Sequence, residues 1–158
     1  MAEREESIDT IDRKILALVQ RNAKMTMQMI AKSVGGISKV AVSYRLKKLE
    51  ECGIIENYYA KLNPEKLGRG YLILSRLVCK VKGKKEITVS KRIASIPGVQ
   101  SVYGIFGDYD LMFIARTKNK ESAKDLLDRV NRIPGVASSN TIVAHTITSE
   151  SLSLDLSD

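Results

Sequence analysis

Apolar residues in the first third of the chain recur at spacings of three and four, a pattern typical of amphipathic helices. The pattern predicts a first helix over residues 7–22, in which Ser7 or Asp9 can cap the amino end. A second helix is expected after Thr26 and a third after Ser38, because the hydroxyl of each can cap a helix. The positions expected to be buried are Ile8, Ile11, Ile15, Leu18 and Val19 in the first helix, Met27, Ile30, Ala31 and Val34 in the second, and Val42, Leu46 and Leu49 in the third.

Glycines mark the ends of these helices. Gly35-Gly36 breaks the second helix, and Gly53 ends the third, which runs to about Cys52. A helix, a glycine turn and another helix form the helix-turn-helix pattern. The face of the third helix opposite its apolar stripe suits the major groove of DNA, where Lys and Ser side chains reach base edges and phosphates. An ordinary surface helix is the alternative interpretation. The face carries Val40, Ser43, Tyr44 and Lys47, with Lys39 and Lys48 at its edges.

After Gly53 the pattern changes to short strand-like runs alternating with helical ones. A strand is expected over residues 54–62, and from Tyr71 on the predicted order is βαββαβ. The segment Ile96-Pro97-Gly98-Val99 recurs thirty-seven residues later as Ile133-Pro134-Gly135-Val136, each time between a helix and a strand. Turn chemistry alone could explain the repeat, but two copies of one βαβ unit predict a ferredoxin-like sandwich and an α+β chain. The predicted strands are 71–81, 99–106, 111–117 and 136–148, and the predicted helices are 86–95 and 121–132.

Charge is distributed unevenly along the chain. Lys plus Arg number 26 and Asp plus Glu 18, so the formal net charge is +8. No acidic residue lies between Asp12 and Glu50, across all three predicted helices. A surface with positive charge only is what a protein needs to displace counterions from DNA phosphates. Nucleic acid is therefore the leading partner, ahead of an acidic membrane surface. The basic residues of this stretch are Arg13, Lys14, Arg21, Lys24, Lys32, Lys39, Arg45, Lys47 and Lys48.

Composition also argues against several classes of protein. Residues 1–14 contain no apolar run, so we expect no secretory signal and a cytoplasmic location. The longest apolar stretches are far shorter than the roughly 20 residues that cross a bilayer, so no membrane association is expected. Cys52 and Cys79 form no C-x-x-C pair, and His145 is the single histidine, so we expect no metal site and no cofactor. A dyad using His145 has no supporting motif, and no catalytic residue is predicted.

Between two predicted strands lies the turn Gly107-Asp108-Tyr109-Asp110. A simple hairpin turn explains these residue types, since Gly and Asp favour turn conformations. Carboxylates beside Gly and exposed backbone amides could also hold the ammonium and carboxylate of a zwitterion. General acid–base catalysis is a weaker alternative, because no partner residue is apparent.

Four segments of the chain together resemble the Lrp/AsnC family, the feast/famine regulatory proteins, over about residues 7–150. They are Ile11-Asp12-Arg13-Lys14-Ile15-Leu16, Ser38 with Val42-x-x-Arg45-Leu46-Lys47-Lys48-Leu49-Glu50, Gly53-Ile54-Ile55 and Gly107-x-Tyr109-Asp110. The resemblance implies a winged-helix type of helix-turn-helix domain (1–53), a strand-bearing linker (54–68) and a ferredoxin-like, ACT-like domain (69–158) that senses amino acids. It also implies a homodimer, assembly to a tetramer or octamer, and binding to pseudo-palindromic double-stranded DNA.

The resemblance assigns roles to individual residues. The recognition helix follows Ser38, and Arg45 matches a family arginine that contacts phosphate or braces the helix. Residues 54–62 match a strand that pairs between protomers. The turn before the recognition helix carries one residue more than the family pattern, which could rotate that helix. The implied DNA-binding residues are Thr26, Ser38, Lys39, Val40, Ser43, Tyr44, Arg45, Lys47 and Lys48, and the implied effector-binding residues are Gly107, Asp108, Tyr109, Asp110, Ser139 and Thr141.

The expected function is therefore transcriptional regulation by a sequence-specific DNA-binding protein that responds to a small amino acid. Two other functions stay open. An architectural DNA-binding protein would use the same helices without an effector, and the 107–110 segment would then be only a turn. A small-molecule enzyme built on the ferredoxin-like domain would need a catalytic constellation, and the sequence offers none.

Overall fold

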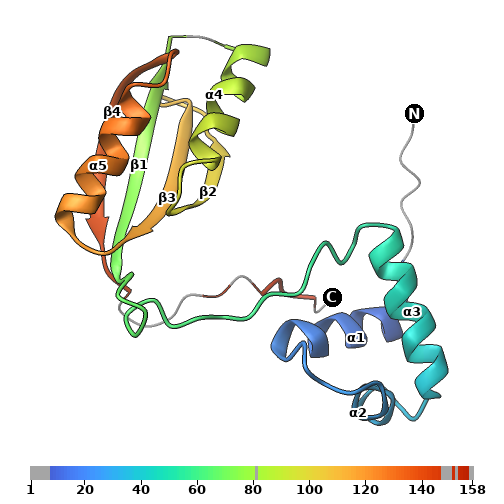
Figure 1. The fold of residues 1–158 in the computed structure, drawn as a ribbon. Coiled ribbons are helices and arrows are strands. Elements are labelled where there is room, and N and C mark those ends of the chain that lie inside the picture. Colours follow the sequence, from blue (N-terminus) through green and yellow to red (C-terminus); the bar gives the residue numbers. More distant parts are fainter. Residues whose placement is uncertain (1–7, 81, 147–150, 152, 157–158) are drawn as a thin grey trace. The chain divides into compact units, whose positions relative to one another are not determined.

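The computed structural model describes residues 8–80, 82–146, 151 and 153–156. The chain forms two compact units, one of Met1–Lys61 with Glu150–Asp158 and one of Leu62–Ser149 (Figure 1). The division expected from the sequence grouped residues 54–68 as a linker and placed the end of the chain with the second domain. In the structure the end of the chain joins the N-terminal unit: the amide side chain of Gln20 accepts from the Leu154 backbone N–H at 2.7 Å.

The N-terminal unit contains the three predicted helices. They are α1 (Thr10–Arg21), α2 (Met27–Ser33) and α3 (Lys39–Glu51). Asp9, Thr26 and Ser38 cap them, each accepting a backbone N–H three residues ahead at 2.8–3.2 Å. Because those amides have no partner within the helix, the caps fix where each helix begins. Asp9 and Asp12 form a reciprocal capping box, so Asp9 caps α1. The other candidate cap, Ser7, lies outside the described residues.

A small hydrophobic core joins the three helices. Ile15, Ile30 and Val42 are each no more than 1% exposed and lie at its centre. Met27 was expected to be buried and is 40% exposed, so that prediction is wrong. Met27 is the first residue of α2, and the buried stripe of that helix begins one turn later, at Ile30. The sequence pattern also left out Leu16, which is 7% exposed.

The turn between α2 and α3 depends on its two glycines. Gly35 has φ +114° and Gly36 has φ +78°, and no described non-glycine residue has a positive φ. The Gly36 N–H donates to the Ala31 carbonyl at 3.0 Å, which ends α2. Both residues of the Gly-Gly pair therefore have a conformation that other residues adopt only at a cost.

The predicted strand over residues 54–62 is absent. These residues form no strand in the described chain, and most of them are exposed. The Ile55 N–H donates back to the Leu49 carbonyl of α3, and the Tyr58 hydroxyl donates to the Glu50 carboxylate. A strand exists only where a second strand pairs with it, and the part of the chain that the structure describes supplies none here.

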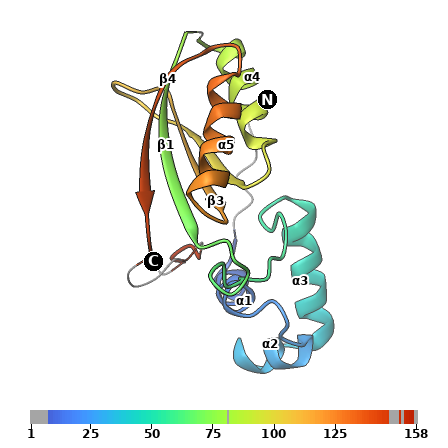
Figure 2. The same ribbon diagram turned by 60° about the vertical axis from the view of Figure 1, so that its left-hand side comes forward.

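The C-terminal unit has the predicted βαββαβ order. Its elements are β1 (Tyr71–Cys79), α4 (Lys84–Ala94), β2 (Val99–Gly104), β3 (Leu111–Thr117), α5 (Lys120–Asn131) and β4 (Val136–Ala144). The strands form one sheet in the order β2-β3-β1-β4, with antiparallel pairing throughout. Both helices cover one face of this sheet (Figure 2). This is the ferredoxin-like sandwich that the sequence predicted.

The repeated Ile-Pro-Gly-Val segments form the same turn twice. In the first copy the Ile96 N–H donates to Ile93 and the Val99 N–H donates to Ile96, at 3.0 and 3.1 Å. The second copy repeats both bonds at the same two distances, from Ile133 and Val136. The glycines have φ +98° and +108°. The repeat is therefore structural, since each copy returns a helix to the sheet.

Successive side chains along each strand point alternately to the two faces of the sheet. On β1, Ile73 and Leu77 pack under the helices with Phe113 of β3, and all three are 1% exposed or less. Between them Ser75 is also fully buried, and its hydroxyl is 2.9 Å from that of Thr141 on β4. This bond satisfies a polar group that would otherwise be costly to bury.

Candidate DNA-binding face and effector turn

The predicted DNA-binding face of α3 is exposed. Val40 is 69% exposed and Tyr44 is 70% exposed, although both are large and apolar enough to be buried. Neighbouring Lys39, Ser43, Lys47 and Lys48 are exposed as well. The opposite side of the same helix buries Val42, Leu46 and Leu49 in agreement with the prediction. A helix anchored on one side and carrying exposed apolar, hydroxyl and basic side chains on the other has the shape and chemistry that a major groove accepts.

Four of the predicted DNA-binding side chains already have partners within the chain, and Arg45 is one of them. The Thr26 and Ser38 hydroxyls cap α2 and α3, as described above. The Lys47 ammonium lies 3.5 Å from the Glu51 carboxylate one turn along the helix. Exposed pairs of this kind contribute little to stability, so Lys47 can exchange Glu51 for a phosphate.

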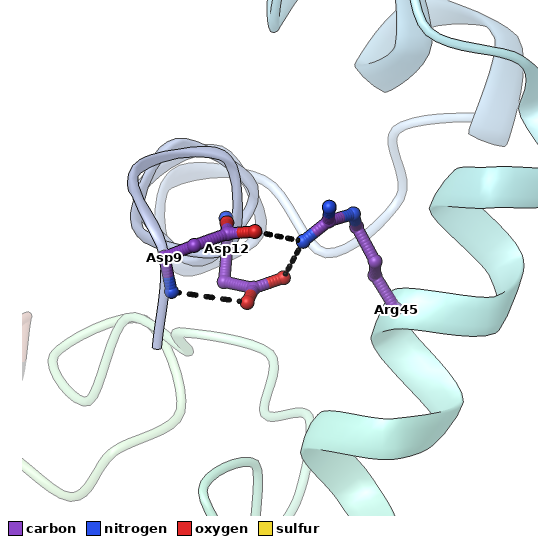
Figure 3. Close-up of polar contacts among 3 residues, drawn as sticks. All are labelled: Asp9, Asp12 and Arg45. Atoms are coloured by element: carbon purple, nitrogen blue, oxygen red, sulfur yellow. Dashed lines mark hydrogen bonds and ion pairs between the residues drawn. The ribbon is translucent and has the colours of Figure 1, made fainter. Parts of the chain in front are cut away.

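Arg45 braces the helices of the N-terminal unit (Figure 3). Its Nη1 atom donates to Asp9 Oδ2 at 2.6 Å and to Asp12 Oδ1 at 2.8 Å, so that α3 is joined to the capped end of α1. The sequence left two roles open for Arg45, phosphate contact or bracing, and this geometry is that of bracing. Asp9 and Asp12 were not predicted from the sequence as the partners of Arg45. The sequence signal that could have identified these partners is their position, because both acids lie directly before the stretch of residues 13–49 that contains no acidic residue.

The ionisation of this cluster follows from its geometry. The pKa of Asp9 lies below its ordinary value, because the Asp12 N–H donates to its carboxylate and Arg45 adds a second bond. The same two carboxylates raise the pKa of Arg45, with Asp12 contributing most. The lowered pKa of Asp9 and the raised pKa of Arg45 keep this ion pair charged at neutral pH, beside a face of α3 that is otherwise basic.

The turn over residues 107–110 is fixed to the end of β1 by Asp110. The Asp110 carboxylate accepts the Cys79 N–H at 2.7 Å and also forms an ion pair with Lys82. The Asp110 N–H donates to the Leu77 carbonyl at 2.8 Å. These contacts lower the pKa of Asp110, the Cys79 amide first and Lys82 second. Asp110 thus holds the turn in place, whereas Asp108 is exposed and Gly107 has φ +115°.

Tyr109 is held from the other side. The Arg76 guanidinium carbon lies 4.6 Å from the centre of the Tyr109 ring, within range of a cation–π contact. The same guanidinium donates to Asn140 Oδ1 of β4 at 3.1 Å. Arg76, Asn140 and Lys82 were missed by the sequence analysis, because each lies 28 or more positions from its partner or on another strand. The strand register places Arg76 opposite Asn140.

The predicted site residues of β4 lie one strand away from the turn. Thr141 is bonded to Ser75 and Ser139 is opposite Leu77, both on β1. The turn itself joins β2 to β3, and β1 lies between β3 and β4. Asp110 and Thr141 therefore both contact β1, and no hydrogen bond among the described residues connects them to each other.

Neither a metal-binding cluster nor a membrane-spanning helix is found among the described residues. No group of three or more His, Cys, Asp or Glu side chains is placed to hold a metal ion. None of the helices in the described ranges combines the length and apolarity needed to cross a membrane.

Comparison with known proteins identifies the family. Residues 8–56 match the model of the winged helix-turn-helix DNA-binding domain, and residues 79–153 match that of the Lrp/AsnC ligand binding domain. The HTH-type transcriptional regulator FL11 of Pyrococcus furiosus is 35% identical over 93% of this chain and 95% of its own length. The chain belongs to the Lrp/AsnC family. The resemblance found in the sequence is thereby confirmed, and the protein is a DNA-binding transcriptional regulator.

Solved structures of this family share the fold. An AsnC family transcriptional regulator from Agrobacterium tumefaciens aligns with a TM-score of 0.86 at 22% identity, covering 94% of this chain and 97% of that one. A transcriptional regulator from Neisseria meningitidis, solved as a complex with L-Met, aligns with a TM-score of 0.84 at 26% identity, covering 95% and 97%.

Proposed function

We propose that this Lrp/AsnC regulator binds specific DNA sequences through the exposed face of α3 and that a small amino acid controls its assembly or DNA affinity. The observation that carries the DNA-binding part is that face. Its apolar, hydroxyl and basic side chains are exposed while the other side of the helix is anchored in the core. Base-edge contacts would come from Lys39, Val40, Ser43, Tyr44 and Lys47, and Lys48 would reach phosphate.

A homodimer gives this proposal its DNA geometry. Two recognition helices related by a two-fold axis would enter successive major grooves about 34 Å apart, which requires a pseudo-palindromic site. Residues 54–62 lack a strand partner in the described chain, and a second copy would supply one, as the family resemblance implies. Dimers assembling to a tetramer or octamer would extend the contact along the DNA.

The effector would bind at the turn of residues 107–110, with Ser139 and Thr141 contributing from β4 on the far side of β1. Exposed Asp108 would hold an ammonium group, and backbone amides near Gly107 would hold a carboxylate. The Neisseria relative was solved with L-Met, and this supports an amino acid as the class of ligand. Control of DNA binding requires the ligand to bind two assembly states with different affinity, because equal affinity shifts nothing.

A gel-shift experiment tests both parts. The purified chain is titrated onto DNA from upstream of its own gene and onto unrelated DNA, with and without each L-amino acid. Sequence-preferring complexes altered by an amino acid are the expected result. Complexes indifferent to sequence and to every amino acid would favour an architectural protein, and the absence of any complex would contradict both.

A further inference from the structure

The C-terminal unit has an open polar cavity at the end of β1 opposite to the 107–110 turn. It has a volume of about 440 Å³, within the range of small-molecule sites. The strand register places it at the opposite end of β1: Tyr71, the first residue of β1, lines it, while the turn is bonded to Cys79, the last. The lining residues are Glu65, Gly68, Gly70, Tyr71, Lys118, Val143, Ala144 and His145.

A tight turn of the chain before β1 builds one wall of this cavity. The Gly68 N–H donates to the Glu65 carbonyl at 3.0 Å, and the Arg69 N–H donates to the Pro64 carbonyl at 2.7 Å. The Glu65 carboxylate packs so closely over Gly70 that a Cβ atom there would overlap it. Gly68 has φ +63°. Gly68 therefore suits the backbone of this turn, and a side chain at position 70 would require the Glu65 carboxylate to move.

The other walls supply the opposite charge and an apolar surface. Lys118 follows the end of β3, and His145 follows the end of β4, directly after Val143 and Ala144. Among the described residues, no hydrogen bond or ion pair engages the Glu65 carboxylate, the Lys118 ammonium or the His145 imidazole. A carboxylate and an ammonium that share a cavity without pairing are available to a ligand that carries both charges.

We propose that this cavity binds a small zwitterion, a free α-amino acid, as a site separate from the 107–110 turn. Glu65 accepts from the ligand's ammonium group, Lys118 donates to its carboxylate, and Val143 and Ala144 contact its side chain. Tyr71 and His145 offer further hydrogen-bonding atoms.

The position of the cavity gives such a ligand a route to regulation. The C-terminal unit connects to the N-terminal unit at two places, before residue 62 and after residue 149. Glu65 to Gly70 lie within the C-terminal unit just after the first connection, and His145 lies just before the second. A ligand held by both would restrict both connections at once, whereas a ligand at the turn touches neither.

Binding can be followed at the cavity itself, because His145 is the single histidine of the chain. The full-length protein, labelled with ¹³C-histidine, is titrated with each L-amino acid, and the imidazole resonance reports on the cavity. Isothermal titration calorimetry gives the affinity and the number of sites. The N-acetyl and amide derivatives of any amino acid that binds test the need for both charges.

Matched variants separate this cavity from the turn. Glu65→Gln and Lys118→Gln remove one charge each at the cavity, and Glu121→Gln and Lys124→Gln make the same changes at exposed positions outside it. Asp108→Asn changes the turn. Gly70→Ala displaces the Glu65 carboxylate without altering any charge.

The expected result is a shift of the His145 resonance by at least one amino acid. Glu65→Gln, Lys118→Gln and Gly70→Ala should each weaken that response about tenfold or more, and Asp108→Asn and the two control variants should leave it unchanged. Both derivatives should fail to produce the shift. The proposal is overturned if no amino acid shifts the resonance, or if Asp108→Asn abolishes the shift while the cavity variants retain it. Gel shifts with Asp108→Asn report separately on the effector turn, so the two sites can fail independently.

Discussion

The two compact units each contain a charged cross-link between distant segments, and they differ in what the cross-link holds. In the N-terminal unit Arg45 joins α3 to α1, and the exposed face of α3 points elsewhere. In the C-terminal unit Asp110 belongs to the candidate effector turn itself and joins it to β1. In the N-terminal unit, the residue that stabilises the fold is therefore separate from the face that would bind DNA. In the C-terminal unit, Asp110 both stabilises the fold and belongs to the turn that would bind the effector.

Core size adds to this contrast. Among the described residues, the buried cluster under the sheet has thirteen members, against six between the three helices. A smaller core leaves a unit more dependent on each additional interaction. We therefore expect the Arg45 cross-link to matter more to its unit than the Asp110 cross-link matters to its own.

The largest expected effect is on the exposed face of α3. Ser43→Asp places a negative charge where DNA phosphates approach, and DNA affinity should fall about a hundredfold through repulsion and the loss of counterion release. The unfolding midpoint should not change, because Ser43 is exposed. Gel shifts and thermal melts measure the two quantities. Ser95→Asp, an exposed position in the other unit, serves as the control, and an equal loss of affinity there would show that the effect is not local.

The next largest effect concerns Arg45. Arg45→Ala leaves the Asp9 and Asp12 carboxylates facing each other without their cation, and we expect a loss of about 1 kcal/mol in the free energy of unfolding. DNA affinity should fall less than tenfold and its salt dependence should stay the same. Denaturant titration and gel shifts at several salt concentrations measure this.

Lys48→Ala is the matched control on the same helix, because Lys48 is exposed. It should lower the salt slope of DNA binding by about one and leave stability unchanged. The reverse pattern, in which Arg45→Ala lowers the slope and preserves stability, would make Arg45 a phosphate contact.

A smaller effect should separate the two carboxylates of the turn. Asp110→Asn weakens the bonds to Cys79 and Lys82 and should lower the unfolding midpoint, while Asp108→Asn should not. Because the pKa of Asp110 is lowered on folding, its contribution to stability is present above the ordinary value of 3.8 and disappears as the pH falls through the folded value. Thermal melts from pH 5 to acid should therefore converge for the wild type and Asp110→Asn. Equal midpoints at pH 5 would contradict the cross-link.

Much of this fold could be predicted from the sequence. Spacing of apolar residues and capping chemistry act over a few residues, so they located all three helices and the caps Thr26 and Ser38. The repeated Ile-Pro-Gly-Val turn located the ferredoxin-like unit for the same reason. The strand expected over residues 54–62 does not form within the single described chain, because strand formation depends on a partner, which local sequence does not supply.

The candidate sites were only partly predictable. Exposure of Val40 and Tyr44 follows from their place opposite the apolar stripe of α3. The partners of Arg45 lie 33 and 36 positions away, and those of Asp110 lie 31 and 28 positions away. No periodicity connects such positions, so local sequence does not distinguish a charged residue that binds a ligand from one that holds the chain together. The packing of helices and the register of strands decide this.

The smallest expected effect concerns the segment that leaves the N-terminal unit. The Tyr58 hydroxyl donates to Glu50 Oε1 at 2.7 Å, and burial together with this carboxylate raises the pKa of Tyr58 to about 12. Since the folded pKa is raised above the ordinary value of 10, this contact stabilises the fold fully below pH 10 and loses its effect as the pH rises through about 12. Tyr58→Phe should therefore lower the unfolding midpoint slightly at pH 9 and make it less sensitive to alkali. Tyr59→Phe, at a neighbouring side chain that is 78% exposed, should change neither quantity. If Tyr58→Phe and the wild type lose stability in parallel between pH 10 and 12, the segment after α3 is not held by this bond. The separation between an anchored helix and a free DNA-binding face would then rest on the Arg45 cross-link and the small core alone.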